Sequence, residues 1–134
     1  MVTMPAMVAT QVADLRAVIF SSGVCDLEAA FESSARDLRW AIENEAGVSS
    51  EAFLVRCAHH HAHKIQSETM LLHGRHDDRA PVAQAELFSK ALSDSGLPVT
   101  LNISECGHRI PREYVRAALR PFLQRMFAPA VTFH

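Results

Sequence analysis

The chain has 134 residues, a length typical of one domain with a substantial buried core. Its 13 basic and 15 acidic side chains give a net charge of −2, which argues against general attraction to nucleic acid. No apolar run approaches the roughly 20 residues that a membrane span needs, and the N-terminus lacks the features of a signal peptide. The cysteines match no zinc or redox spacing, so we expect reduced thiols in a cytoplasmic protein.

Strands and helices alternate along the chain. We expect strands at residues 17–20, 69–73 and 98–103, and helices at residues 83–95 and 112–127. The first two strands have uninterrupted apolar runs, as in strands covered on both faces of a parallel sheet. The third alternates apolar and polar residues, which favours a place near the sheet edge. The pattern predicts an α/β fold in a single domain over residues 1–134.

Glycine and proline mark the ends of these elements. Gly74 turns the chain after the second strand, and Gly96 stops the helix that follows. Pro121 falls inside the last helix and predicts a kink or a break there. Helical periodicity also covers residues 5–12 before the first strand, and residues 26–46 and 52–57 after it.

Four histidines within residues 59–63 raise the hypothesis of a metal site. Adjacent histidines, however, point their rings in divergent directions. We therefore interpret this run as an exposed connection, and we expect no metal and no cofactor.

Candidate catalytic side chains follow the strands. Asp77 and Asp78 come after the second strand and His108 after the third, at the strand ends where open α/β sheets place their chemistry. Taken singly, Asp77 reads as a turn carboxylate that caps the next helix, and His108 as a loop histidine. After the first strand, Ser21, Ser22 and Cys25 are weak candidates, because none lies in the Gly-x-Ser-x-Gly turn that exposes a nucleophilic serine.

Three motifs together resemble the α/β-hydrolase fold, and within it the prolyl-oligopeptidase-like serine peptidases and esterases. Residues 73–84 read HGRHDDRAPVAQ and are followed about thirty residues later by Gly107-His108. Residues 17–27, AVIFSSGVCDL, resemble the sixth strand of that fold and the loop after it. Residues 62–65, AHKI, fit the approach to the seventh strand. The resemblance covers nearly the whole chain.

The resemblance implies roles for individual residues. Asp77 matches the catalytic acid and His108 the catalytic base, while Arg79 falls where some peptidases bind a substrate carbonyl. Asp78 is then a loop-bracing residue. A carboxylate that fixes the tautomer of an imidazole is what acyl transfer by a serine triad requires.

The resemblance also implies what the sequence does not contain. The family order is nucleophile, acid, base, and this chain begins with what resembles the helix after the nucleophile. We expect about three parallel strands flanked by helices, the C-terminal half of the fold, without the first five strands or the nucleophile elbow. Acid and base without a nucleophile predict a chain inactive by itself.

The resemblance also predicts an exposed edge on strand 17–20, where the preceding strand of the family fold would pair. We expect a homodimer, or association with the missing N-terminal half, through this edge. The alternative function is a non-catalytic dimerising or interaction module derived from the hydrolase fold.

Overall fold

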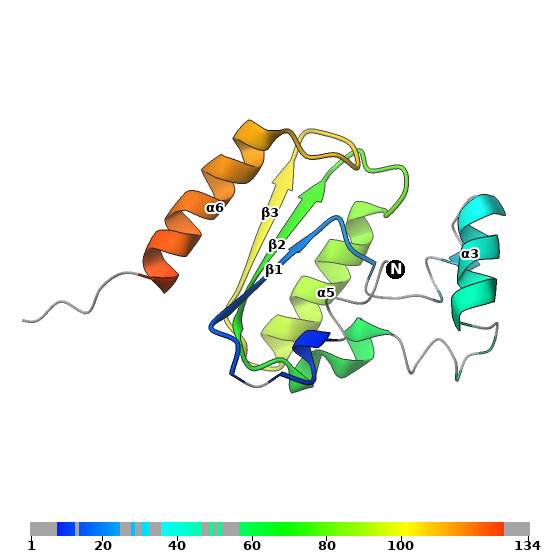
Figure 1. The fold of residues 1–134 in the computed structure, drawn as a ribbon, viewed down its shortest axis with the longest axis horizontal. Coiled ribbons are helices and arrows are strands. Elements are labelled where there is room, and N and C mark those ends of the chain that lie inside the picture. The colour runs from blue at the N-terminus through cyan, green and yellow to red at the C-terminus, as the bar shows by residue number, and fades with distance from the viewer. Residues whose placement is uncertain are drawn as a thin grey trace, which may run out of the picture.

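The computed structural model describes residues 8–12, 14–24, 28, 31–32, 36–46, 49, 51 and 57–127. Within these residues the sheet has three strands, β1 (Ala17–Ser21), β2 (Glu68–Gly74) and β3 (Val99–Ser104), in that spatial order. Both pairings are parallel, with Ala17 opposite Glu68 and Thr69 opposite Val99. All three strands therefore end at the same edge of the sheet (Figure 1). This is the α/β architecture that the sequence predicts.

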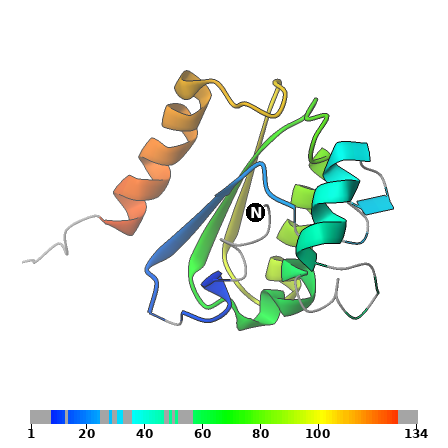
Figure 2. The ribbon, with the colours of Figure 1, turned by 45° about the vertical axis from the view of Figure 1, so that its right-hand side comes forward.

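Helices cover both faces of the sheet. Helix α5 (Val82–Asp94) lies on one face and α6 (Arg112–Met126) on the other, as the two ribbon views show (Figures 1 and 2). The 3-10 helix η1 (Ala58–Lys64) lies on the α5 side, and α3 (Arg36–Ala46) lies on the side of the molecule away from α6. Each of α5 and α6 follows a strand directly, as helices in parallel α/β units do.

The residues of β2 alternate between two cores, because successive side chains of a strand point to opposite faces. Leu71 belongs to the core under α5 and η1, which also contains Phe20 and Phe88 with their rings 5.5 Å apart. Met70 and Leu72 belong to the core under α6. This burial on both faces explains the uninterrupted apolar run of β2, the central strand among those described.

Two features differ from the sequence-based expectations. The histidine run is not a simple exposed connection, since it forms η1, in which Ala58 and Ala62 are buried in the core. Of the kink or break expected at Pro121, the break does not occur, because the last helix continues from Arg112 to Met126. Gly96 ends α5 with a φ of 80°, a conformation that glycine adopts without strain.

Some expectations fall on residues outside the described ranges. These are the first part of the helix at 5–12, much of the helical stretch at 26–46, residues 52–56, and the weak nucleophile candidate Cys25. In the part of the chain that the structure describes, no helix is long and apolar enough to cross a membrane.

Candidate active site

The loops that follow β2 and β3 meet at the edge of the sheet where the strands end, and they bring Asp77 and His108 together. Nδ1 of His108 lies 2.9 Å from Oδ2 of Asp77 and 3.2 Å from Oδ1. A carboxylate only accepts hydrogen bonds, so Nδ1 carries the proton and donates it. The Nε2 atom of His108 is then the basic nitrogen, on a side chain that is 32% exposed.

Asp77 is held rigidly from the other side by its own loop. The backbone N–H groups of Arg79 and Ala80 donate to Oδ1 at 2.8 and 2.9 Å, and the Asp77 side chain is fully buried. Burial raises the pKa of Asp77, but the hydrogen bonds from Ala80, His108 and Arg79 outweigh it, so its pKa lies below the usual value. Asp77 is therefore both the turn carboxylate and the partner of His108, two roles that the sequence left as alternatives.

The lowered pKa of Asp77 predicts loss of stability in acid. A carboxyl whose pKa is lower in the folded state stabilises the fold above its unfolded pKa, about 3.9, and this contribution disappears as the pH falls through the folded pKa. We expect the free energy of unfolding, measured by denaturant titration, to fall as the pH drops below about 4. The pKa of Glu105 is lowered too, by hydrogen bonds from Arg75 and His76, and adds to the effect in the same direction.

A substitution separates the contribution of Asp77 to the pH dependence of unfolding free energy from the contributions of other carboxyls. The Asp77→Asn variant should show a flatter dependence of unfolding free energy on pH below about 4 than the unsubstituted chain. Asp78→Asn is the matched control, because Asp78 is exposed and makes no ion pair with any described residue. Identical pH profiles for both variants would contradict the assignment.

The two loops also make direct backbone contact. The N–H of Arg75 donates to the carbonyl of Ser104 at 2.9 Å, and the N–H of His76 to the carbonyl of Cys106 at 3.0 Å. Gly74 packs so closely against the carbonyls of Cys106 and Gly107 that a Cβ on it would overlap both. The need for this approach, rather than a special φ, explains the glycine, and it holds the loop of Asp77 against the loop of His108.

We expect Gly74→Ala to destabilise the chain by about 1–3 kcal/mol, the usual penalty for forcing an extra carbon into a packed site. The new methyl meets backbone atoms, which cannot rotate away as a side chain can. Chemical denaturation measures the loss. Gly23→Ala is the control, because nothing lies within 4 Å of a Cβ at that glycine. Equal stability of the two variants would mean that the loops are not in this close contact.

A surface ion-pair network also connects the loops. The carboxylate of Glu105 lies 2.6 Å from Nε of Arg75 and 2.9 Å from Nε2 of His76. All three side chains are at least half exposed, so solvent screens these pairs and each contributes little to stability. The buried contacts around Gly74 and Asp77 therefore dominate the alignment of the loops.

Ser22, just after β1, contacts the loop that carries His108. Its φ of 53° lies in the left-handed region that non-glycine residues seldom adopt. Its hydroxyl donates to the backbone carbonyl of His108 at 3.0 Å, and its N–H donates to the carbonyl of Leu72 at 2.9 Å. From its sequence position Ser22 is only a weak nucleophile candidate, and in the structure its hydroxyl holds the backbone that carries the imidazole of His108.

The other predicted site residues lie on the acid loop. Arg79 gives its backbone N–H to Asp77, while the residue as a whole is exposed at the loop surface. Asp78 is also exposed, and the bracing that the sequence assigned to it is done by Asp77. The histidine run at residues 59–63 lies in η1, away from these loops in chain and in space. Among the described residues, no group of three or more His, Cys, Asp or Glu side chains is placed to hold a metal ion.

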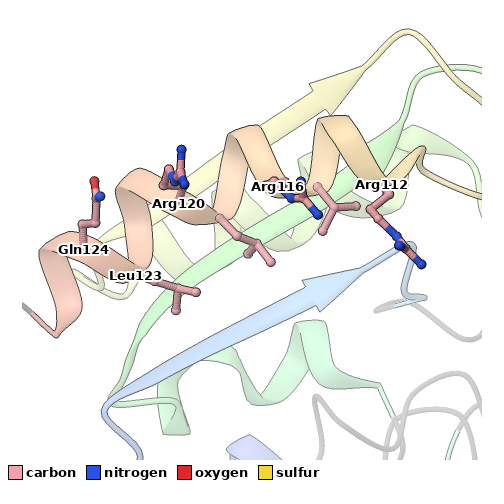
Figure 3. Close-up of a pocket in the computed structure, with 7 residues that line it drawn as sticks. Arg112, Arg116, Arg120, Leu123 and Gln124 are labelled. Carbon is pink, nitrogen blue, oxygen red and sulfur yellow. The ribbon is translucent and has the colours of Figure 1, made fainter.

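An open hollow lies along α6, and neither Asp77 nor His108 is among the residues that line it. It is lined by apolar and basic side chains of that helix: Val115, Leu119, Leu123, Arg112, Arg116, Arg120 and Gln124. In Figure 3, Leu123 points to the side of α6 opposite Arg120 and Gln124. No described residue forms an ion pair with any of these three arginines, in contrast to Arg125, which pairs with Glu68 at 3.1 Å.

Comparisons with known proteins agree with the α/β fold described above. The sequence model of the prolyl oligopeptidase family matches residues 2–128. No curated protein matches the chain by sequence. Among solved structures, a puromycin-hydrolyzing peptidase of Mycobacterium tuberculosis superposes with a TM-score of 0.83 at 22% identity, over 92% of this chain and 20% of its own.

Two further solved structures have the same fold. An acylaminoacyl peptidase of Pyrococcus horikoshii gives a TM-score of 0.80 at 20% identity, over 98% of this chain and 23% of that chain. A puromycin hydrolase gives 0.82 at 20% identity, over 96% and 21%. The chain thus spans about a fifth of the length of the solved structures that it resembles.

Proposed function

Because the chain belongs to the prolyl oligopeptidase family, we propose that it supplies the acid and the base of a serine-hydrolase triad that cleaves peptides or esters by acyl transfer. Asp77 is the acid, His108 the base, and Arg79 faces the substrate. The observation that carries the proposal is the 2.9 Å contact between Nδ1 of His108 and a buried carboxylate oxygen of Asp77. An imidazole held in this way takes a proton from a hydroxyl at Nε2 and passes it to the leaving group.

The nucleophile is expected from outside these 134 residues. They contain no Gly-x-Ser-x-Gly turn, and the hydroxyl of Ser22 is engaged with a backbone carbonyl rather than with the imidazole. Without a nucleophile the pair cannot form an acyl-enzyme, so the chain by itself is inactive.

A fluorophosphonate probe read by intact mass tests this proposal. We expect no adduct on the 134-residue chain alone. We expect an adduct on a serine of the longer protein, and its formation should be lost in the His108→Ala variant. An adduct on the chain alone that disappears in His108→Ala would show that the nucleophile lies within these residues.

The missing partner is proposed to dock beside β1. Among the described strands β1 pairs only with β2, and Ile19, 37% exposed, faces the α6 side of its open edge. Such an edge presents unpaired backbone groups to another strand. The hollow of α6 adds apolar surface, including Leu123 at 38% exposure, on the same face of the sheet.

Charge favours an acidic segment of the hydrolase over a second copy of the chain. Two β1 edges that pair antiparallel about a two-fold axis keep α6 on the same face in both copies, which brings two sets of three unpaired arginines to that face. An acidic strand–helix segment from the rest of the hydrolase would instead neutralise the single set of three arginines on one copy of α6. Light scattering at micromolar concentration separates the cases. A homodimer that survives low salt would contradict this choice, whereas a monomer supports it.

The exposed edge and the basic, apolar hollow of α6 favour a second candidate function, a non-catalytic interaction module. Under that reading the longer protein shows no probe adduct although it binds its partner through β1 and α6. We propose a cytoplasmic location, since Cys57 and Cys106 are both free thiols.

A further inference from the structure

A second histidine lies behind the acid. His73, the penultimate residue of β2, is 1% exposed, although most side chains around it in that strand are apolar. Its Nε2 atom lies 2.6 Å from the backbone carbonyl oxygen of Ala80. A carbonyl oxygen only accepts, so Nε2 carries a proton and donates it. A buried imidazole on β2 is therefore hydrogen-bonded to the end of the loop that carries Asp77, at Ala80, the residue before Pro81.

The same ring nitrogen approaches the carboxylate. Nε2 of His73 lies 3.4 Å from Oδ2 of Asp77, the oxygen that accepts from His108 on the opposite, more open side. The carboxylate thus lies between two imidazoles. At this distance the proton of His73 is directed to Ala80, and its contact with Oδ2 is electrostatic rather than a second full hydrogen bond.

Ala80 couples the two contacts. Its N–H donates to Oδ1 of Asp77 at 2.9 Å, and its carbonyl accepts from His73, while the residue itself is 1% exposed. Both polar groups of one buried backbone segment are thereby satisfied, one by the acid and one by the histidine. If His73 loses its donor, the buried carbonyl of Ala80 has to seek water or another donor, and the N–H that orients Asp77 moves with it.

We infer that His73 is a positioning residue for Asp77, which acts through Ala80 to keep the Oδ2 atom directed at Nδ1 of His108. It does not touch substrate. Its effect is to keep the neutral His108 ring protonated at Nδ1, so that Nε2 remains the basic nitrogen. The inference rests on the proposed triad role of the pair, but it concerns a geometry that can be measured in this chain without substrate or nucleophile.

The test uses ¹⁵N chemical shifts of the His108 ring, which report the fraction of the neutral ring protonated at Nδ1. The full chain is measured at a pH well above the ordinary imidazole range. His73→Leu removes the donor while keeping an apolar side chain in the buried site. His73→Gln is the matched variant, because its terminal amide reaches the position of Nε2 and keeps a donor for Ala80.

We expect the unsubstituted chain and His73→Gln to keep His108 protonated at Nδ1, and His73→Leu to lose part of that population to the Nε2 form while its backbone spectrum stays folded. Asp77→Asn gives the reference for complete loss of carboxylate control. An unchanged Nδ1 fraction in a folded His73→Leu variant would overturn the inference.

Should His73→Leu fail to fold, the comparison passes to His73→Asn, whose shorter amide does not reach Ala80. Loss of the Nδ1 form in His73→Asn but not in His73→Gln supports the inference, and equal behaviour of the two overturns it. These results are independent of the proposed function, because failure of the probe reaction in the longer protein leaves the tautomer of His108 in this chain unaffected.

Discussion

In the hydrolase proposed above, with a nucleophilic serine supplied from outside these residues, Asp77→Asn is expected to lower kcat by about 10⁴-fold, the loss that follows when a triad carboxylate becomes an amide. The amide can present its NH₂ to Nδ1 of His108, which puts the imidazole proton on Nε2 and removes the base. The change also removes the charge that stabilises the imidazolium formed during acyl transfer. Steady-state hydrolysis of an activated ester or a short peptide measures the effect.

Asp78→Asn is the matched control, since it makes the same chemical change on the next residue. Asp78 is exposed and makes no contact with the imidazole, so we expect kcat close to that of the unsubstituted protein. Equal losses in the two variants, or full activity in Asp77→Asn, would remove Asp77 from the role of acid. An NMR spectrum showing that Asp77→Asn is folded would exclude loss of stability as the cause of the lower kcat.

Phe122→Ala is expected to destabilise the isolated chain by about 3–5 kcal/mol, the range for removing a buried aromatic side chain. Phe122 is 2% exposed and is the largest fully buried side chain among the described residues. It packs with Ala118 of α6 against Met70 and Leu72 of the central strand. Five partly buried apolar side chains also pack against this cluster, so their partial collapse into the cavity favours the lower end of this range. Urea or guanidinium unfolding gives the difference in free energy.

Leu123→Ala, on the next residue of α6, is the control for this prediction. Leu123 is 38% exposed in the hollow of α6, so its truncation removes less buried surface from the isolated chain than truncation of Phe122 does. We expect a change within roughly 0.5 kcal/mol, as for most surface substitutions. Similar losses at the two positions would mean that α6 does not pack on the sheet through Phe122.

The pair Asp77 and His108 was predictable because local sequence signals mark both positions. An apolar strand followed by glycine and acidic residues, and a second strand followed by Gly107-His108, place both side chains at the ends of parallel strands. The histidine run and Pro121 were less predictable. Whether a proline-containing segment stays helical, or a polar run packs its alanines into a core, depends on what covers it, which the local sequence does not contain.

Ser22 and His73 were not identified as supporting residues by sequence reasoning. The partner of Ser22 is the backbone carbonyl of His108, 86 residues away in the chain, and a carbonyl has no sequence signature. His73 lies close in sequence to both of its contacts, but its direction depends on the alternation of β2 and on the fold of the loop around Ala80. The positive φ of Ser22 likewise depends on how β1 ends against its neighbours, which the local sequence does not show.

The sequence by itself determined the strand and helix order, the parallel α/β class and the positions of Asp77 and His108 after their strands, because periodicity and turn residues are local properties of the chain. Tertiary structure alone decided how the pair is aligned. The close approach of Gly74 to the carbonyls of Cys106 and Gly107, and the contact between the carboxylate of Asp77 and the imidazole of His108, arise where segments distant in sequence meet. Such contacts depend on the relative positions of whole strands, which the two parallel pairings of the sheet set and no short segment encodes.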